Sequence, residues 1–409
     1  MNPSYPAIRD EIRSSIMQKI DFSREVPDSE VLDLIDRQLT NGGEDPVILM
    51  PLEEKKRLRQ ELFHSIRRMD VLQDLLEDPE VTEIMVNGPD NIFMEKAGSL
   101  ARYPGKFSSP GKLEDVIQQI VGASNRVVNT SSPIVDCRLE NGDRVNVVLN
   151  PIAVNGPILT IRRFPQDPIT MKDLLRFGSI TEEVSDFLGK CVRAGLNIFI
   201  SGGTGSGKTT FLNVLSDCID PGERVITIED NAELQIRHVP NLVRMEARNA
   251  NVEGCRPISI RELIKASLRM RPDRIVVGEV RGPEAIDMIQ AMNTGHDGSM
   301  STGHANSAKD MLSRLETMIL MGMDLPVPAI RGQLASGIDL IVHLGRLRDR
   351  SRKLLEVVEV LGMEDGQIRL STLYRFTETG EENGRITGVW EKEKEINHRF
   401  KFEMAGIPV

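Results

Sequence analysis

The chain has 409 residues, which at roughly 150 residues per domain predicts two or three domains. Lys and Arg number 51 against 61 Asp and Glu, so the formal net charge is −10. With only 12 Phe, 3 Tyr and 1 Trp, such a chain is a poor candidate for a dedicated nucleic-acid surface, which needs a basic face or aromatic stacking platforms. Hydrophobic residues make up 40%, which excludes a disordered chain.

The cysteines and the start of the chain indicate a cellular compartment. Without a C-x-x-C pair, the cysteines predict neither a disulfide framework nor a zinc site, but free buried thiols in a reducing cytosol. They are Cys137, Cys191, Cys218 and Cys255. The N-terminus lacks the apolar core of a signal peptide, and no apolar run approaches the ~20 residues needed to span a bilayer. We expect a soluble, cytoplasmic protein whose membrane contact is indirect.

The first 164 residues predict two regions. Residues 1–70 form helices, because Leu58, Leu62 and Ile66 recur at helical spacing among charged residues. Residues 71–164 form a small α+β domain with a helix over 112–128. Its short β-like runs, separated by Asn-Gly turns, are 84–86, 91–94, 144–149 and 158–161.

Residues 165–178, rich in proline at their start, predict a linker, and 179–409 predict an α/β domain. Ser179 and Glu182 form an expected capping box that opens a helix ending near Ala194. Unbroken apolar runs then alternate with helices, which is typical of a mostly parallel sheet. These runs are 196–200, 224–228 and 274–277, and a hairpin is expected around 362–366.

The strongest motif follows the first of these strands and opens a helix. It matches G-x-x-x-x-G-K-[ST], in which backbone N–H groups surround phosphate oxygens, Lys208 reaches the β- and γ-phosphates and the Thr209 hydroxyl binds Mg²⁺. We therefore predict a site for ATP and Mg²⁺. The nucleotide-binding residues are Gly202, Gly203, Thr204, Gly205, Ser206, Gly207, Lys208, Thr209 and Thr210.

Two acidic motifs follow further strands. Glu279 comes just after the strand 274–277, at the edge of the sheet where α/β proteins bind ligands, with Gly278 where many P-loop enzymes have Asp. We expect Glu279 to hold Mg²⁺ through water or to polarise the attacking water. Residues 229–233 carry three carboxylates, which from the residues alone are equally a general base or a charge cluster at a turn.

The histidines and arginines leave alternatives open. His296 and His304 flank an expected strand over 299–302, and two lone histidines are more often structural than sensors of the γ-phosphate. An arginine finger can come from another domain or subunit, but position alone does not distinguish it from a solvated charge. The candidates are Arg138, Arg144, Arg162 and Arg163.

Taken together, these motifs resemble the secretion ATPase superfamily, which includes VirB11-like and other type II and type IV secretion ATPases and the type IV pilus motors. Within it, the sequence is most similar to the CpaF subfamily, the tight-adherence (Flp) pilus assembly ATPases. The resemblance covers about residues 70–376. It is carried by 202–209, 226–234, 269–281 and 292–298, and by 75–89, 132–136 and 144–146.

The resemblance implies a RecA-like ATPase domain, an α+β N-terminal domain and a homohexamer that binds ATP between the domains of adjacent subunits. It implies an inner-membrane platform protein as the partner of a motor at the cytoplasmic face of the membrane. Glu233 would be the catalytic base, Glu279 the Walker B residue, His296 and His304 the His box, and Arg144, Arg162 and Arg163 the contacts to the γ-phosphate. A DNA-translocating RecA-like ATPase and a nucleotide-gated scaffold with little hydrolysis are the alternatives.

Overall fold

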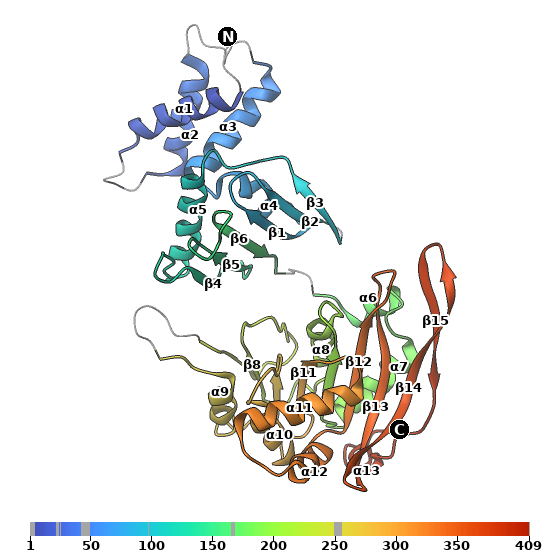
Figure 1. Cartoon of the computed structure of the whole chain (residues 1–409). Coiled ribbons are helices and arrows are strands. Elements are labelled where there is room, and N and C mark those ends of the chain that lie inside the picture. Colours follow the sequence, from blue (N-terminus) through green and yellow to red (C-terminus); the bar gives the residue numbers. More distant parts are fainter. Residues whose placement is uncertain are drawn as a thin grey trace. The chain divides into compact units, whose positions relative to one another are not determined.

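The computed structural model describes residues 5–408 apart from 22–23, 25, 42–49, 97, 165–167 and 249–255. The chain divides into two compact units, Met1–Pro165 and Gln166–Val409 (Figure 1). Among the described cysteines, Cys137, Cys191 and Cys218 are free thiols, and Cys255 lies outside the described residues. In the part of the chain that the structure describes, no helix has the length and apolarity needed to cross a membrane.

Unit 1 begins with helices, as the sequence predicts. Ile16, Ile35, Leu58 and Leu62 are fully buried between three of them and form a separate small core. These helices are α1 (Tyr5–Lys19), α2 (Asp28–Asn41) and α3 (Leu52–Arg67), and a short turn and α4 (Gln73–Glu77) follow.

The rest of unit 1 is an antiparallel sheet covered by one helix, α5 (Pro110–Ala123). The sheet has the order β3-β2-β1-β6-β5-β4. Two of its strands are missing from the sequence prediction, β3 and β4. Both lie at edges of the sheet and contain no buried residue, so they lack the apolar alternation of a half-buried strand. The strands are β1 (Val81–Asn87), β2 (Ile92–Lys96), β3 (Ser99–Tyr103), β4 (Ile134–Arg138), β5 (Arg144–Val148) and β6 (Ile158–Arg162).

Unit 2 is built on a nine-stranded sheet of order β15-β14-β13-β12-β7-β11-β10-β8-β9. The strands from β12 to β9 in this order are parallel, and β13, β14 and β15 extend the sheet as antiparallel hairpins. The expected hairpin is thus confirmed. The strands are β7 (Ile198–Gly202), β8 (Val225–Glu229), β9 (Leu242–Glu246), β10 (Arg274–Val277), β11 (Met300–His304), β12 (Leu340–Arg346), β13 (Arg352–Glu364), β14 (Gln367–Glu382) and β15 (Arg385–Lys392).

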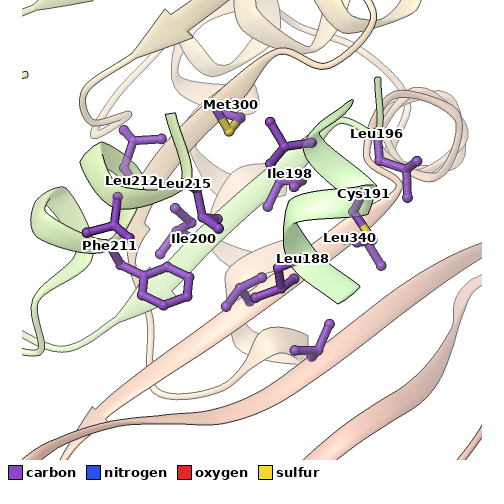
Figure 2. Packing of buried hydrophobic residues seen from close by; sticks show 14 of the residues in the cluster. Leu188, Cys191, Leu196, Ile198, Ile200, Phe211, Leu212, Leu215, Met300 and Leu340 are labelled. Carbon is purple, nitrogen blue, oxygen red and sulfur yellow. The ribbon is translucent and has the colours of Figure 1, made fainter. Parts of the chain in front are cut away.

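Helices cover both faces of this sheet. Figure 2 shows Leu188 and Cys191 from one helix and Phe211 and Leu215 from the next packing on Ile198 and its neighbours. A second buried cluster fills the other face. The helices are α6 (Met171–Arg176), α7 (Glu182–Arg193), α8 (Lys208–Ser216), α9 (Ile260–Ser267), α10 (Ala285–Asn293), α11 (Ala308–Gly322), α12 (Val327–Gly337) and α13 (Arg399–Met404).

Two local predictions need correction. The segment predicted as a linker contains α6, which a capping box of Thr170 and Asp173 starts. The cap of α7 is Thr181 and not Ser179: the Thr181 hydroxyl accepts the backbone N–H of Val184 at 3.4 Å. Thr181 has the extended backbone of an N-cap, and only the residue directly before the first helical turn can cap it.

Candidate nucleotide site

The phosphate loop connects β7 to α8 and needs glycine at defined points. Gly207 has φ of +94° and caps α8, a conformation that side chains disfavour. A Cβ atom on Gly202 would lie 2.5 Å from the carbonyl oxygen of Leu344 in the neighbouring strand. The Ser206 hydroxyl donates to the Gly203 carbonyl at 2.8 Å and closes the loop. The first turn of α8, whose N–H groups have no acceptor within the helix, follows directly on this loop, and such an arrangement suits an anion.

Lys208, in the first turn of α8, links the loop to a neighbouring strand. Its Nζ donates to the Gly203 carbonyl at 3.1 Å and lies 3.3 Å from Nδ1 of His304, the last residue of β11. Burial lowers the pKa of Lys208, although the negative charge of Glu279 opposes this shift. The lysine is therefore a pre-positioned cation at the carboxyl end of the sheet.

His304 continues the contacts to the acidic motif after β10. Burial and the positive charge of Lys208 lower the pKa of His304, whereas the negative charge of Glu279 opposes this shift. Its Nδ1 faces Nζ of Lys208, and its Nε2 lies 2.8 Å from Oε1 of Glu279. That short distance lacks hydrogen-bond alignment. His304 thus bridges the lysine of one motif and the glutamate of another.

Arg281 extends this series to the third strand. Its guanidinium donates to Oε2 of Glu279 at 2.6 Å, and its other nitrogen lies 3.9 Å from Oδ2 of Asp230, just after β8. The negative charge of Glu233 also contributes to the raised pKa of Arg281, after the larger effect of its bond to Glu279. We call the series Lys208, His304, Glu279, Arg281 and Asp230 the contact chain. Sequence reasoning missed the role of Arg281, which stands two residues after Glu279.

A pocket of about 490 Å³ opens beside the contact chain. Gly203, Thr204 and His304 line one side of it. The other side is a polar face of α11, which the sequence analysis also missed although its spacing of three and four residues was a signal. This face consists of Asp310, Ser313, Arg314 and Thr317.

The structure separates the two histidines. Strands β7 and β11 are parallel, with His304 opposite Gly202 at the carboxyl end. His296 precedes the start of β11, where its Nδ1 lies 3.2 Å from the carbonyl oxygen of Ala291. It therefore lies at the other edge of the sheet, at least a five-residue strand away from the phosphate loop. A role for His296 in catalysis stays a prediction that the geometry of unit 2 does not support.

The candidate arginines belong to unit 1. Arg138, Arg144 and Arg162 lie opposite one another on β4, β5 and β6 and form a row across the sheet. Arg163 is used differently: its Nε lies 3.1 Å from the buried Asp143, and it donates to the carbonyl oxygens of two residues around α4. Arg163 therefore stabilises unit 1, while the approach of any of these arginines to a nucleotide stays a prediction.

A phosphate loop after a buried parallel strand, with a carboxylate at the end of a strand two places away, defines a P-loop α/β fold. Residues 67–387 match the family described as type II/IV secretion system protein. The chain belongs to this family.

Curated relatives agree with this assignment. A putative conjugal transfer protein of Mycobacterium tuberculosis (strain H37Rv) is 34% identical over 310 residues, which cover 74% of this chain and 87% of that protein. The probable conjugal transfer protein TrbB of Sinorhizobium fredii is 34% identical over 316 residues, covering 76% and 93%. The type IV secretion system protein PtlH homolog of Bordetella bronchiseptica is 32% identical over 302 residues, covering 68% and 89%.

Solved structures support the fold alone. The X-ray structure of the Legionella pneumophila ATPase DotB gives a TM-score of 0.52 at 21% identity, over 73% of this chain and 81% of that one. The ATPase DotB of Yersinia pseudotuberculosis gives 0.53 at 18% identity, over 71% and 78%.

Proposed function

We propose that the protein is an ATP-hydrolysing motor of a secretion or pilus-assembly machine. The contact chain carries this proposal, because it brings residues of separate motifs to the edge of the sheet that holds the phosphate loop. Family membership and relatives with identities above 30% support it. Charged groups in mutual contact beside an anion site are the arrangement that phosphoryl transfer needs.

Each motif has a chemical role in this proposal. The loop amides and Lys208 bind the phosphates of ATP. Thr209 and Glu279 would hold Mg²⁺, because a hard cation prefers oxygen ligands and Oε1 of Glu279 makes no hydrogen bond in the described structure. When bound, Mg²⁺ supplies positive charge that neutralises the phosphates. Glu233 orients and deprotonates the attacking water, and His304 connects Lys208 to Glu279.

We further propose that the active form is a homohexamer in which Arg144 and Arg162 of one subunit contact the γ-phosphate held by the next. Arg162 lies opposite Glu83 on one neighbouring strand and opposite Arg144 on the other. Like charges on neighbouring strands repel, so a further anion beside Arg144 and Arg162 would be favourable. Arg163, held by Asp143, keeps the strand that carries Arg162 in place.

The motifs at 75–89, 132–136 and 144–146 favour assembly of tight-adherence (Flp) pili, as in the CpaF subfamily. We propose that the motor acts at the cytoplasmic face of the membrane and contacts an inner-membrane platform protein. The second candidate is a DNA-translocating ATPase, since two relatives are named conjugal transfer proteins. The net charge of −10 disfavours it.

ATPase activity across a protein concentration series, with mass by light scattering on the same samples, tests the proposal. We expect Mg²⁺-dependent activity that rises with the hexamer population and does not respond to DNA. Stimulation by DNA would favour the second candidate. Full activity in a monomer would contradict the role of arginines from a neighbouring subunit.

The variant Lys208→Ala tests the site itself. We expect ATP binding and hydrolysis to fall to background, because the cation for the phosphates is lost while the loop glycines remain. Lys172→Ala, which removes an exposed lysine of α6, is the matched control and should leave both unchanged. Equal activity in both variants would place the nucleotide elsewhere.

A further inference from the structure

Glu229 is a buried carboxyl group that the proposed mechanism does not use. It is the last residue of β8 and is 3% exposed. Burial raises its pKa to about 7, although two backbone N–H groups oppose this shift. A group that is costly to bury in its charged form needs a structural or functional reason to be there.

The contacts of Glu229 determine the path of the segment that carries Glu233. Its Oε2 accepts the backbone N–H of Glu233 at 2.7 Å and that of Leu234 at 3.0 Å. Leu234 is buried in the core of unit 2 and anchors the end of the segment. One carboxylate oxygen therefore holds the backbone of the proposed catalytic base directly.

Gly278 provides the space for this side chain. It follows β10, next to β8, and its N–H donates to the carbonyl of Ile228 at 2.9 Å. A Cβ atom on Gly278 would lie 2.9 Å from Cγ of Glu229, closer than real contacts of this kind. The Thr302 hydroxyl donates to the Gly278 carbonyl at 2.8 Å, so the backbone is held from the other side.

We propose that Glu229 and Gly278 are a matched pair that positions Glu233, and that Gly278 replaces the Asp of many P-loop enzymes because the side chain of Glu229 fills that space. This inference rests on the proposed function for the role of Glu233. Glu229 is then a positioning residue that acts through the backbone of the segment 229–234. Its requirement is an acceptor oxygen of the right reach, not a negative charge.

A double-mutant cycle tests the steric half of the pair without any activity measurement. We expect Gly278→Ala to lower the melting temperature of the nucleotide-free protein by roughly 3–6 °C, because the added methyl group overpacks a buried site. In a Glu229→Ala background the same change should cost almost nothing. The atoms at 2.9 and 3.4 Å, Cγ and Oε2, are then gone, and the Cβ of residue 229 lies at an ordinary contact distance of 3.5 Å. Gly332→Ala in α12, where a Cβ meets no atom within 4 Å, is the control.

Enzyme kinetics test the positioning half. Gly278→Ala and Glu229→Ala should each lower kcat about 100-fold, the effect of a misplaced catalytic group, with less than a threefold change in the Kd of a fluorescent ATP analogue. Glu229→Gln keeps the acceptor oxygen and should keep kcat within about threefold of wild type.

The possible outcomes separate the two proposals. An equal melting-temperature loss for Gly278→Ala in both backgrounds, or a Glu229→Gln enzyme as slow as Glu229→Ala, would overturn the matched pair. If the wild-type protein hydrolyses no ATP, the proposed function fails, and the melting-temperature cycle still decides whether the two residues are coupled. Should Glu229→Ala not fold, Gly278→Ala in the otherwise wild-type chain still tests the pair, and an unchanged melting temperature and kcat in that variant would overturn it.

Discussion

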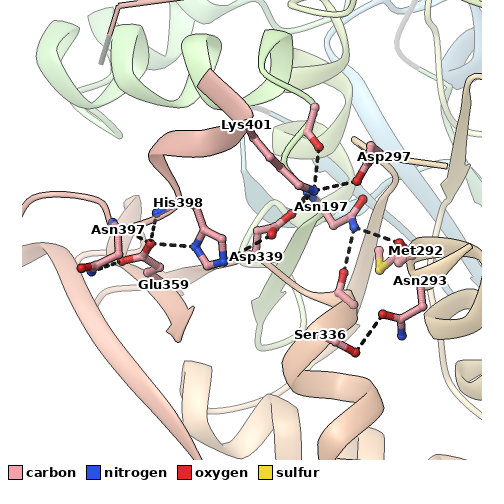
Figure 3. A network of polar contacts seen from close by, with 12 residues as sticks. Asn197, Met292, Asn293, Asp297, Ser336, Asp339, Glu359, Asn397, His398 and Lys401 are labelled. Atoms are coloured by element: carbon pink, nitrogen blue, oxygen red, sulfur yellow. Dashed lines mark hydrogen bonds and ion pairs between the residues drawn. The ribbon is translucent and has the colours of Figure 1, made fainter. Parts of the chain in front are cut away.

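In unit 2, the parallel strands end at one side of the sheet, the carboxyl edge, and begin at the other, the amino edge. One of these two edges carries a partly exposed polar cluster and the other a buried one. At the edge where β7 and β11 end, the contact chain is partly exposed: the side chain of Glu279 is 18% exposed and that of His304 33%. At the edge where these strands begin, Asp339 and Glu359 are almost fully buried, with side chains 7% and 0% exposed. Figure 3 shows this second cluster.

In the buried cluster, the carboxylates are bonded to other groups of the protein. The carboxylate of Glu359 accepts the backbone N–H groups of Asn397 and His398 and a side-chain bond from each. Lys401 of α13 contacts Asp339 at 2.8 Å and Asp297 at 2.7 Å (Figure 3). The bond to Glu359 raises the pKa of His398, although burial of the ring opposes this shift.

The difference teaches how to distinguish binding groups from structural groups. A buried charge is stable only if its partners come from the protein itself, as they do around Glu359. The contact chain instead keeps accessible groups and one carboxylate oxygen without a hydrogen bond beside a pocket. We therefore expect changes at the carboxyl edge to affect activity and changes at the amino edge to affect stability.

The largest expected effect is on catalysis, from Glu279→Gln. ATP should still bind, because the phosphate loop is intact, while kcat falls by a factor of at least about 100 with the loss of the negative charge. Single-turnover kinetics and the Kd of an ATP analogue measure the two effects. A wild-type kcat would remove Glu279 from the mechanism and contradict the expectation that changes at the carboxyl edge affect activity.

At the opposite edge, we expect Lys401→Met to lower the free energy of unfolding by about 3 kcal/mol, because Asp339 then keeps a buried charge with one cation fewer. Urea unfolding measures the loss. ATP binding by the folded variant should be unchanged, and a large loss of affinity would contradict the division between the two edges. Lys392→Met, which removes an exposed ion pair to Glu395 on the surface, is the matched control.

The pH dependence of stability sharpens the comparison at Glu229. Its folded pKa of about 7 lies above the ordinary 4.5, so the native state binds more protons than the unfolded state between these values. The contribution of Glu229 to the free energy of unfolding should therefore fall by roughly 2 kcal/mol as pH rises from 4.5 to 7. The neighbouring charges of Arg244 and Glu233 oppose and assist this shift, respectively.

Glu229→Gln cannot titrate, so subtracting its urea-unfolding profile from that of wild type isolates this contribution. We expect the difference in unfolding free energy between the two proteins to change between pH 4.5 and 7 and to be constant below pH 4.5. Parallel profiles would mean that folding does not shift the pKa of this carboxyl group.

The smallest expected effect is at a helix cap. Thr181→Ala should cost about 1 kcal/mol of unfolding free energy, because the N–H of Val184 loses its acceptor. Ser179→Ala, at the position that the sequence pattern favours, should cost less than half of that. If urea unfolding showed a larger loss of unfolding free energy for Ser179→Ala than for Thr181→Ala, Ser179 would be the cap, as the sequence pattern predicts. Neither change should alter ATP binding.

Local patterns in the sequence were sufficient for part of this molecule. The loop from Gly202 to Thr209, the buried strand 274–277 and the hairpin around 362–366 were predicted because each depends on the backbone preferences and periodicity of a few adjacent residues. The edge strands β3 and β4 were missed for the same reason, since exposed strands carry little periodic signal.

Only the tertiary structure decided which of the chemically plausible residues meet. The order of the parallel strands places β11 between β7 and β10, so His304 reaches both Lys208 and Glu279 while His296 lies at the other edge. Strand order depends on packing between residues far apart in the sequence, which no local pattern reports. The same holds for Arg281 and for the contact between Glu229 and Gly278, because a side chain's partners come from neighbouring strands and not from its neighbours in the chain.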